Sequence, residues 1–179
     1  LEAAVCKLAH TGTPVLGICG GYQMLGETLS DPHGTEGGGE MRGMGLLPAD
    51  TVFSSRKTRT RMQAEVLAPD FAGAKLDGYE IHTGKTTVRG DAFCLLENGR
   101  PDGCVSGNVF GTYLHGLFDT GSLSRKLAEY LCRRKGIPCE QAAPVSHGEY
   151  QERQFDLLAD GIRRALDMKA VYALLEGKR

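Results

Sequence analysis

Residues 14–26 read Pro-Val-Leu-Gly-Ile-Cys-Gly-Gly-Tyr-Gln-Met-Leu-Gly, and this stretch indicates the fold class. The run Val15–Ile18 is apolar on both faces, which is typical of a central parallel strand. It ends at Cys19, after which apolar residues recur at helical spacing from Tyr22 to Leu29. A strand, a tight turn and a helix in this order predict an α/β fold.

Cys19 occupies the position of a nucleophile in this arrangement. The pattern G-x-C-x-G is the thiol counterpart of the G-x-S-x-G turn of hydrolases. Gly17 and Gly21 would let strand and helix approach closely, while Gly20 tolerates strained dihedral angles and offers its N–H to an oxyanion. The N-terminus of the helix favours the thiolate. A lone buried cysteine is more often a packing residue, so catalysis requires a partner base.

His115 is the candidate base. It ends the strand-like run Val109–Leu114, and open α/β sheets place their sites at the carboxyl ends of strands. A thiolate that cycles through acyl transfer needs such a neighbour. A single histidine is more often structural, but Cys19 and His115 at the ends of matched strands together favour catalysis.

The remaining pattern predicts helices at both ends and a β-rich middle. A helix is expected at the start, over residues 1–8, and a loop dense in Gly over 30–45. Later helices are expected over 123–131 and 155–166. Short strands are expected over 51–53, 62–67, 86–89, 93–96, 104–106 and 108–114, with a turn at Asp77-Gly78, an N-cap at Ser122 or Ser124 and a helix stop at Gly136.

The composition excludes several classes of protein. The 21 Lys and Arg against 22 Asp and Glu give a net charge of -1, so nothing draws the chain to nucleic acid or membranes. The basic run Arg56–Arg61 is interpreted as a solvated face. Without an apolar stretch of about 20 residues or a secretory signal, a cytoplasmic protein is expected. The six cysteines form no C-x-x-C pair, so we expect neither a disulfide framework nor a bound metal.

The stretches Gly17–Gly26 and Tyr113–Asp119 resemble class I, triad-type glutamine amidotransferases. Residues 31–32, 43–48 and 78–84 are most similar to the cobyric acid synthase family within that class. The resemblance implies a flavodoxin-like open sheet, mixed parallel and antiparallel, with flanking helices. It also implies that residues 1–179 are an N-terminally truncated glutaminase domain that lacks its first strand or strands. An ATP-dependent synthetase domain is expected upstream.

The resemblance further implies a reaction. Cys19 would attack glutamine, His115 would move the protons, Gly20 would contribute to the oxyanion hole and Gln23 would contact the substrate. The ammonia would serve ATP-dependent amidation of carboxylates b, d, e and g of adenosylcobyrinic acid a,c-diamide, a corrinoid acceptor, in cobalamin biosynthesis. ATP and Mg²⁺ would bind the synthetase domain, and this chain would hold no cofactor.

Some questions stay open at this point. Leu117 stands two residues after the histidine, where triad enzymes carry a glutamate, so a backbone carbonyl, Asp119 or Glu80 are the candidates for orienting the imidazole. The roles of His82 and Lys57 are also open. Gly78–Thr86 imitates a phosphate loop but has one residue too many between its glycines, so no ATP site is expected there.

Other functions compete with this interpretation. Related amidotransferases act in cobyrinic acid a,c-diamide synthesis or in amidation of glutamate in lipid II. A truncated domain that only docks on a partner, without catalysis, is the third possibility.

Overall fold

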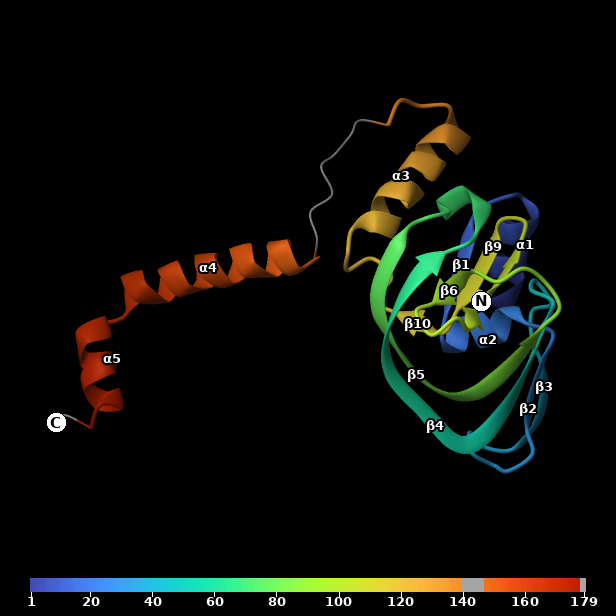
Figure 1. Cartoon of the computed structure of the whole chain (residues 1–179), viewed down its shortest axis with the longest axis horizontal. Coiled ribbons are helices and arrows are strands. Elements are labelled where there is room, and N and C mark those ends of the chain that lie inside the picture. Colours follow the sequence, from blue (N-terminus) through green and yellow to red (C-terminus); the bar gives the residue numbers. More distant parts are fainter. Residues whose placement is uncertain (140–146, 178–179) are drawn as a thin grey trace.

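The computed structural model describes residues 1–139 and 147–177 and contains two mixed β-sheets with flanking helices (Figure 1). The smaller sheet has the order β1 (Val15–Ile18), β9 (Val109–Thr112) and β8 (Cys104–Ser106). The larger sheet runs β10 (Leu114–His115), β5 (Lys75–Val88), β4 (Ala49–Val66), β2 (Thr28–Asp31) and β3 (Gly39–Arg42), with β6 (Cys94–Leu96) beside β4 and β7 (Pro101–Asp102) beside β6. The helices are α1 (Glu2–His10), α2 (Gly20–Leu25), α3 (Ser122–Lys135), α4 (His147–Ala165) and α5 (Met168–Leu175), with a 3-10 turn η1 (Pro69–Phe71).

The small sheet separates two apolar clusters because successive side chains of a strand point to opposite faces. All four residues of β9 are buried. Val109 joins the cluster that contains Ala9 of α1 and Leu25 of α2. The next residue, Phe110, joins the cluster that includes Leu123 of α3. Helices therefore cover both faces, and the α/β class predicted from the sequence is confirmed.

The predicted parallel strand is present, although its position in the sheet differs from the expectation. β1 pairs in parallel with β9, with Val15 opposite Val109 and Ile18 opposite Thr112. Within the described part of the chain, β9 is the central strand of this sheet and β1 lies at its edge. Parallel pairing aligns the carboxyl ends of the two strands, which are the ends that carry the candidate site residues.

The helix after Cys19 is shorter than predicted. α2 ends at Leu25 because Gly26 is extended and its backbone lies against β4, where a Cβ on Gly26 would sit 2.5 Å from the carbonyl oxygen of Ala49. Leu29, which fits the helical spacing, belongs to β2 instead. Its i+4 relation to Leu25 is compatible with either element, so periodicity alone could not separate them.

The loop expected over residues 30–45 contains a hairpin. β2 and β3 pair antiparallel, with Leu29 opposite Met41. The connection is ordered by the carboxylate of the buried Asp31, which accepts hydrogen bonds from backbone N–H groups of Thr35, Glu36 and Gly38. The hydrogen bonds to this one buried side chain therefore order a connection that its glycines would otherwise leave flexible.

The middle of the chain consists of longer strands than predicted. The segments expected over 51–53 and 62–67 are both parts of β4, which pairs antiparallel with β5 along almost its whole length. The register shifts between Phe53 and Thr58, an irregularity of the kind that bends a ribbon. Figure 1 shows these two strands curving together around one side of the body.

The pair Asp77-Gly78, expected as a turn, lies inside β5. Gly78 is required for close approach, because a Cβ there would lie 2.0 Å from the carbonyl oxygen of His115. The predicted stop of α3 is present, since Gly136 adopts the left-handed conformation at φ 65°. Its N-cap, however, is Gly121 rather than Ser122 or Ser124.

The helix expected over residues 155–166 is the second half of α4, which begins at His147 and ends at Ala165. In Figure 1, α4 and α5 lie apart from the two sheets. No helix among the described residues combines the length and apolar character needed to cross a membrane.

Gly111→Ala tests the packing of β9. Its Cβ would lie 2.2 Å from ring carbon Cδ2 of Tyr22, which is 1% exposed. Neither group can move aside in a packed core, so we expect the free energy of unfolding to fall by about 1–3 kcal/mol in urea denaturation. Gly161→Ala in α4, whose Cβ meets nothing, is the control and should leave the transition of the body unchanged. An unchanged midpoint for Gly111→Ala would contradict the packing.

Candidate active site

Cys19 lies at a sharp turn between β1 and α2 and has a strained backbone. Its φ of 54° and ψ of -114° make it the one non-glycine residue with positive φ in the described chain. Its N–H donates to the carbonyl of Thr112 at 2.9 Å, and its carbonyl accepts from the N–H of Gln23 at 3.1 Å. These two hydrogen bonds fix the turn from the sheet side and from the helix side. Such strain persists only where the surroundings enforce it, and it concentrates at functional sites.

Of the three glycines at the turn, only Gly17 has the role that the sequence predicts for its missing side chain. A Cβ on Gly17 would lie 2.5 Å from Leu25 and 2.8 Å from the backbone of Gly21, so close approach does require Gly17. Gly20 has no positive φ, and a Cβ on Gly20 or Gly21 would meet nothing within 4 Å. The strained conformation expected at Gly20 therefore belongs to Cys19. The N–H of Gly20 stays in the first turn of α2, where backbone N–H groups lack helical partners.

The thiol of Cys19 faces β5. The half-buried Sγ donates to the carbonyl oxygen of Ile81 at 3.5 Å. Ile81 lies two residues beyond Tyr79, which is paired in the ladder with His115. The turn and β10 therefore meet the same short stretch of β5, and this brings the two candidate catalytic residues to one region.

His115 is held by its neighbours on β5. Its backbone pairs with Tyr79, and its carbonyl packs over Gly78. Its imidazole stacks on the ring of Tyr79, with centroids 4.9 Å apart and planes 5° from parallel. Nε2 is buried, and among the described residues it has no hydrogen-bond partner. Sequence reasoning missed Tyr79, because only the strand register places it beside the histidine.

Neither carboxylate considered for orienting His115 is hydrogen-bonded to its Nε2 in the described chain. Glu80 projects from the face of β5 opposite to Tyr79, since adjacent strand residues alternate. The Asp119 carboxylate lies by Gly116, with Oδ2 3.1 Å from the position of a Cβ there. Leu117, at the usual glutamate position, is 1% exposed and belongs to the apolar core.

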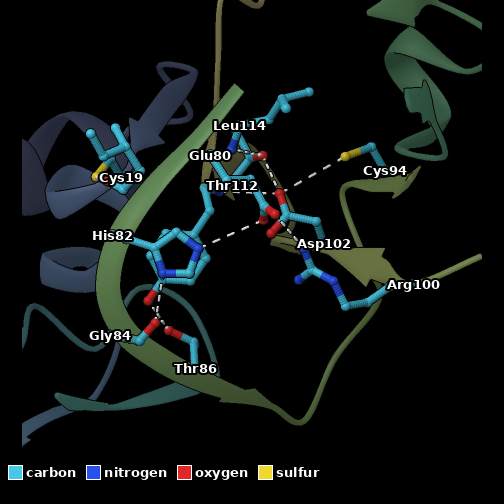
Figure 2. Close-up of polar contacts among 12 residues, drawn as sticks. Cys19, Glu80, His82, Gly84, Thr86, Cys94, Arg100, Asp102, Thr112 and Leu114 are labelled. Carbon is cyan, nitrogen blue, oxygen red and sulfur yellow. Dashed lines mark hydrogen bonds and ion pairs between the residues drawn. The ribbon is translucent and has the colours of Figure 1, made fainter. Parts of the chain in front are cut away.

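A polar cavity of about 770 Å³ lies on the Glu80 face of β5. Glu80 is fully buried, accepts a hydrogen bond from Arg100 at 2.5 Å and approaches Nε2 of His82 at 3.7 Å. Burial opposes its charge, but His82 and Arg100 outweigh burial and hold the pKa of Glu80 below its usual value. Figure 2 shows Arg100 on the opposite side of the β5 ribbon from Cys19.

His82 is anchored inside this cavity. Nδ1 lies 2.7 Å from the carbonyl of Gly84, which can only accept, so Nδ1 carries a proton. Its ring stacks on Tyr113 with centroids 3.7 Å apart. The sequence pattern that imitates a phosphate loop, residues 78–86, is therefore extended strand whose side chains build a cavity wall.

Gln23, predicted to contact substrate, is buried beneath the turn. Its Nε2 donates to the hydroxyl of Tyr113 at 3.1 Å, and that hydroxyl also bonds Thr86 at 2.6 Å. Gly84 lacks a side chain here because its Cβ would lie 2.4 Å from the Gln23 amide. One of the two N–H donors of the Gln23 amide is thus used by Tyr113.

Asp102 is a buried group that sequence reasoning missed, because Pro101-Asp102-Gly103 has the appearance of a turn. Its carboxylate accepts from the hydroxyl of Thr112 at 2.5 Å and the N–H of Tyr113 at 3.1 Å. Burial is the main cause that raises the pKa of Asp102, and burial likewise raises the pKa of the neighbouring Cys94 to about 12. Asp102 thereby holds Thr112, whose carbonyl binds the N–H of Cys19; Figure 2 shows the contact between Asp102 and Thr112.

The basic run Arg56–Arg61 lies on β4 and is largely exposed, as expected for a solvated face. Arg61 forms an exposed ion pair with Asp77 at 3.1 Å. Lys57 is exposed.

The sequence matches a known family. The signature of the CobB/CobQ-like glutamine amidotransferase domain covers residues 1–123. Cobyric acid synthase from Ruminiclostridium cellulolyticum is 43% identical over 98% of this chain and 37% of that protein. The one from Citrobacter koseri is 40% identical over 98% of this chain and 37% of its own length. The chain therefore spans less than two fifths of these relatives.

Two solved structures are similar to this chain in fold. PurLQS from Thermotoga maritima has a TM-score of 0.51 at 18% identity, covering 73% of this chain and 68% of that chain. A Thermoplasma acidophilum protein described as a GMP synthase subunit has a TM-score of 0.50 at 14% identity, covering 75% of this chain and 66% of its own chain. At such identities the likeness supports the fold alone.

The strain at Cys19 predicts a difference between two substitutions. Cys19→Gly removes the positive-φ penalty, whereas Cys19→Ala keeps it, so we expect the glycine variant to be more stable by about 1 kcal/mol in urea unfolding. At an unstrained position the order would be reversed. An alanine variant as stable as the glycine variant, or more stable, would show that the turn is relaxed.

The Glu80 cluster predicts a pH-dependent loss of stability. Because the folded pKa of Glu80 lies below its ordinary 4.5, its contribution is complete above that pH and disappears as pH falls through the folded value. We expect Glu80→Gln to lower the free energy of unfolding by about 1.5–3 kcal/mol at neutral pH, and by less in acid. Glu65→Gln, which breaks an exposed pair with Lys75, is the control and should change little. A difference for Glu80→Gln that grows in acid would contradict the assignment.

Proposed function

The chain belongs to the CobB/CobQ-like glutamine amidotransferase family, and we propose that it hydrolyses glutamine and supplies the ammonia for a cobyric acid synthase reaction. The observation that carries the proposal is the strained Cys19 between β1 and α2, beside the stretch of β5 that holds His115. A backbone held in this conformation presents a thiol at a helix N-terminus, where negative charge is favoured.

In the proposed reaction, Cys19 sulfur attacks the carboxamide carbon of glutamine while His115 takes the thiol proton. Collapse of the tetrahedral intermediate breaks the C–N bond, and His115 gives its proton to the leaving nitrogen, which departs as ammonia. A γ-glutamyl thioester remains on Cys19. His115 then takes a proton from water as the water oxygen attacks the thioester, and returns it to the sulfur as glutamate leaves.

Two further residues have proposed roles in binding. The N–H of Gly20 stabilises the oxyanion of each tetrahedral intermediate. Gln23 contacts glutamine through its side-chain amide, of which one N–H is already used by Tyr113.

The acceptor chemistry is proposed to take place on a synthetase domain of the same polypeptide. That domain would use ATP and Mg²⁺ to amidate carboxylates b, d, e and g of adenosylcobyrinic acid a,c-diamide, in the cytoplasm. The names of the relatives and their greater length support this division of labour. Residues 78–86 supply no phosphate loop, since they are strand.

Separate supply of ammonia tests the proposal. In the chain assayed with its synthetase domain, we expect Cys19→Ala to lower glutamine-dependent amidation by at least about 1,000-fold, because the thioester cannot form. Amidation driven by ammonium chloride should stay within about twofold of the wild type. Cys132→Ala, at a half-buried cysteine of α3, is the control and should behave as wild type with either nitrogen source. Undiminished use of glutamine by Cys19→Ala would refute the nucleophile.

The acceptor is tested in the same assay. Adenosylcobyrinic acid a,c-diamide should be amidated, whereas cobyrinic acid and lipid II should not. Amidation of either alternative acceptor in its place would leave the proposed glutamine hydrolysis standing but would contradict the proposed acceptor.

A further inference from the structure

The imidazole of His115 has one aromatic neighbour that fixes its plane. Tyr79 stacks on it almost in parallel, with planes 5° apart and centroids 4.9 Å apart. The buried Nε2 of His115 has no hydrogen-bond partner among the described residues. The carboxylate that commonly holds such a ring two residues later is replaced by the buried Leu117.

The backbone places Tyr79 for this contact. Tyr79 and His115 are directly opposed in the antiparallel ladder of β5 and β10, so their side chains share one face of the sheet. The preceding Gly78 lets the two strands approach, since any Cβ there would meet the carbonyl of His115 at 2.0 Å. Ile81, two residues further along β5, accepts from the Cys19 thiol. One strand thus contacts both candidate catalytic residues.

The exposure of Tyr79 differs from that of the tyrosines that pack the core. Its side chain is 49% exposed, whereas Tyr22, Tyr113 and Tyr130 are each at most 4% exposed. In the described chain its hydroxyl takes part in none of the hydrogen bonds found. Its contact with His115 is therefore made by the aromatic ring. A ring that is half in solvent contributes less to the core than a buried one.

We propose that Tyr79 is a positioning residue that orients His115 by stacking, in the place of a carboxylate. The inference rests on the proposed glutaminase function. A carboxylate would hold the imidazole through one of its nitrogens, whereas the ring face of Tyr79 fixes the plane and engages neither. Nε2, which has no hydrogen-bond partner among the described residues, takes a proton and returns it in each half of the reaction.

Two substitutions separate the ring from the hydroxyl. In the chain assayed with its synthetase domain, Tyr79→Leu removes the stack and should lower kcat for glutamine hydrolysis about tenfold, with KM within about twofold. Tyr79→Phe retains the ring and should stay within about twofold of wild type for both constants. Tyr150→Leu, at an exposed tyrosine of α4, is the control for loss of a surface ring. Ammonia-driven amidation should be unchanged in all three variants.

NMR spectroscopy detects the stacking of Tyr79 on His115 independently of enzyme activity. The His115 ring is stacked nearly parallel to that of Tyr79, so the ring current of the tyrosine should shift the His115 ring-proton resonances upfield. We expect that shift to persist in Tyr79→Phe and to disappear in Tyr79→Leu. Thermal unfolding of each variant, which we expect to be close to wild type, distinguishes loss of orientation from loss of fold.

The outcomes separate the two proposals. A Tyr79→Leu variant with wild-type kcat would overturn the positioning role while leaving Cys19-dependent hydrolysis intact. Equal damage from Tyr79→Phe and Tyr79→Leu would overturn stacking as the cause, because the hydroxyl would then be the active group. A loss of thermal stability in proportion to the loss of kcat would reassign Tyr79 to stability. If the wild type hydrolysed glutamine no faster than Cys19→Ala, the proposed function would fail first and the positioning role with it.

Discussion

The strained backbone of Cys19 is the constraint on which the rest of the site depends. A non-glycine residue at φ 54° costs about 1–3 kcal/mol, so the turn must be over-determined by its surroundings. The carbonyl of Thr112 holds the N–H of Cys19 from β9, and the first turn of α2 holds its carbonyl. Because Gly17 has no side chain, α2 can pack directly against β1. The fully buried β9 thus anchors the Cys19 turn to the core.

β5 is the second organising element, and its alternating faces serve different ends. Tyr79 lies on the face that meets His115, and the Ile81 carbonyl meets the Cys19 thiol. Glu80 and His82 line the polar cavity on the other face. There burial is outweighed by the hydrogen bonds from His82 and Arg100, which lower the pKa of Glu80, while burial raises the pKa of Asp102. The two carboxylates of one cavity therefore have opposite preferences for protonation. The strand therefore separates the candidate site at Cys19 and His115 from the buried polar network around Glu80.

Much of the site could be predicted from the sequence because its signals are local. The close approach of strand and helix at the Cys19 turn requires Gly17, two residues away, and Gly136 ends α3 by its own left-handed conformation. Non-local pairing could not be predicted in the same way. Asp77-Gly78 has the sequence pattern of a turn, but Gly78 is needed because the carbonyl of His115, distant in the sequence, packs against it. The stack of Tyr79 and the bonds of Asp102 depend on the same register, so sequence spacing held no signal for either.

The central claim is that Cys19 carries the γ-glutamyl group during turnover. The most direct measurement is acid quench of the enzyme during glutamine hydrolysis, followed by peptide mass spectrometry of all six cysteines. The account predicts a γ-glutamyl thioester on the peptide that contains Cys19, and on no other cysteine peptide. A γ-glutamyl group on a different cysteine, with Cys19 unmodified during full turnover, would contradict it.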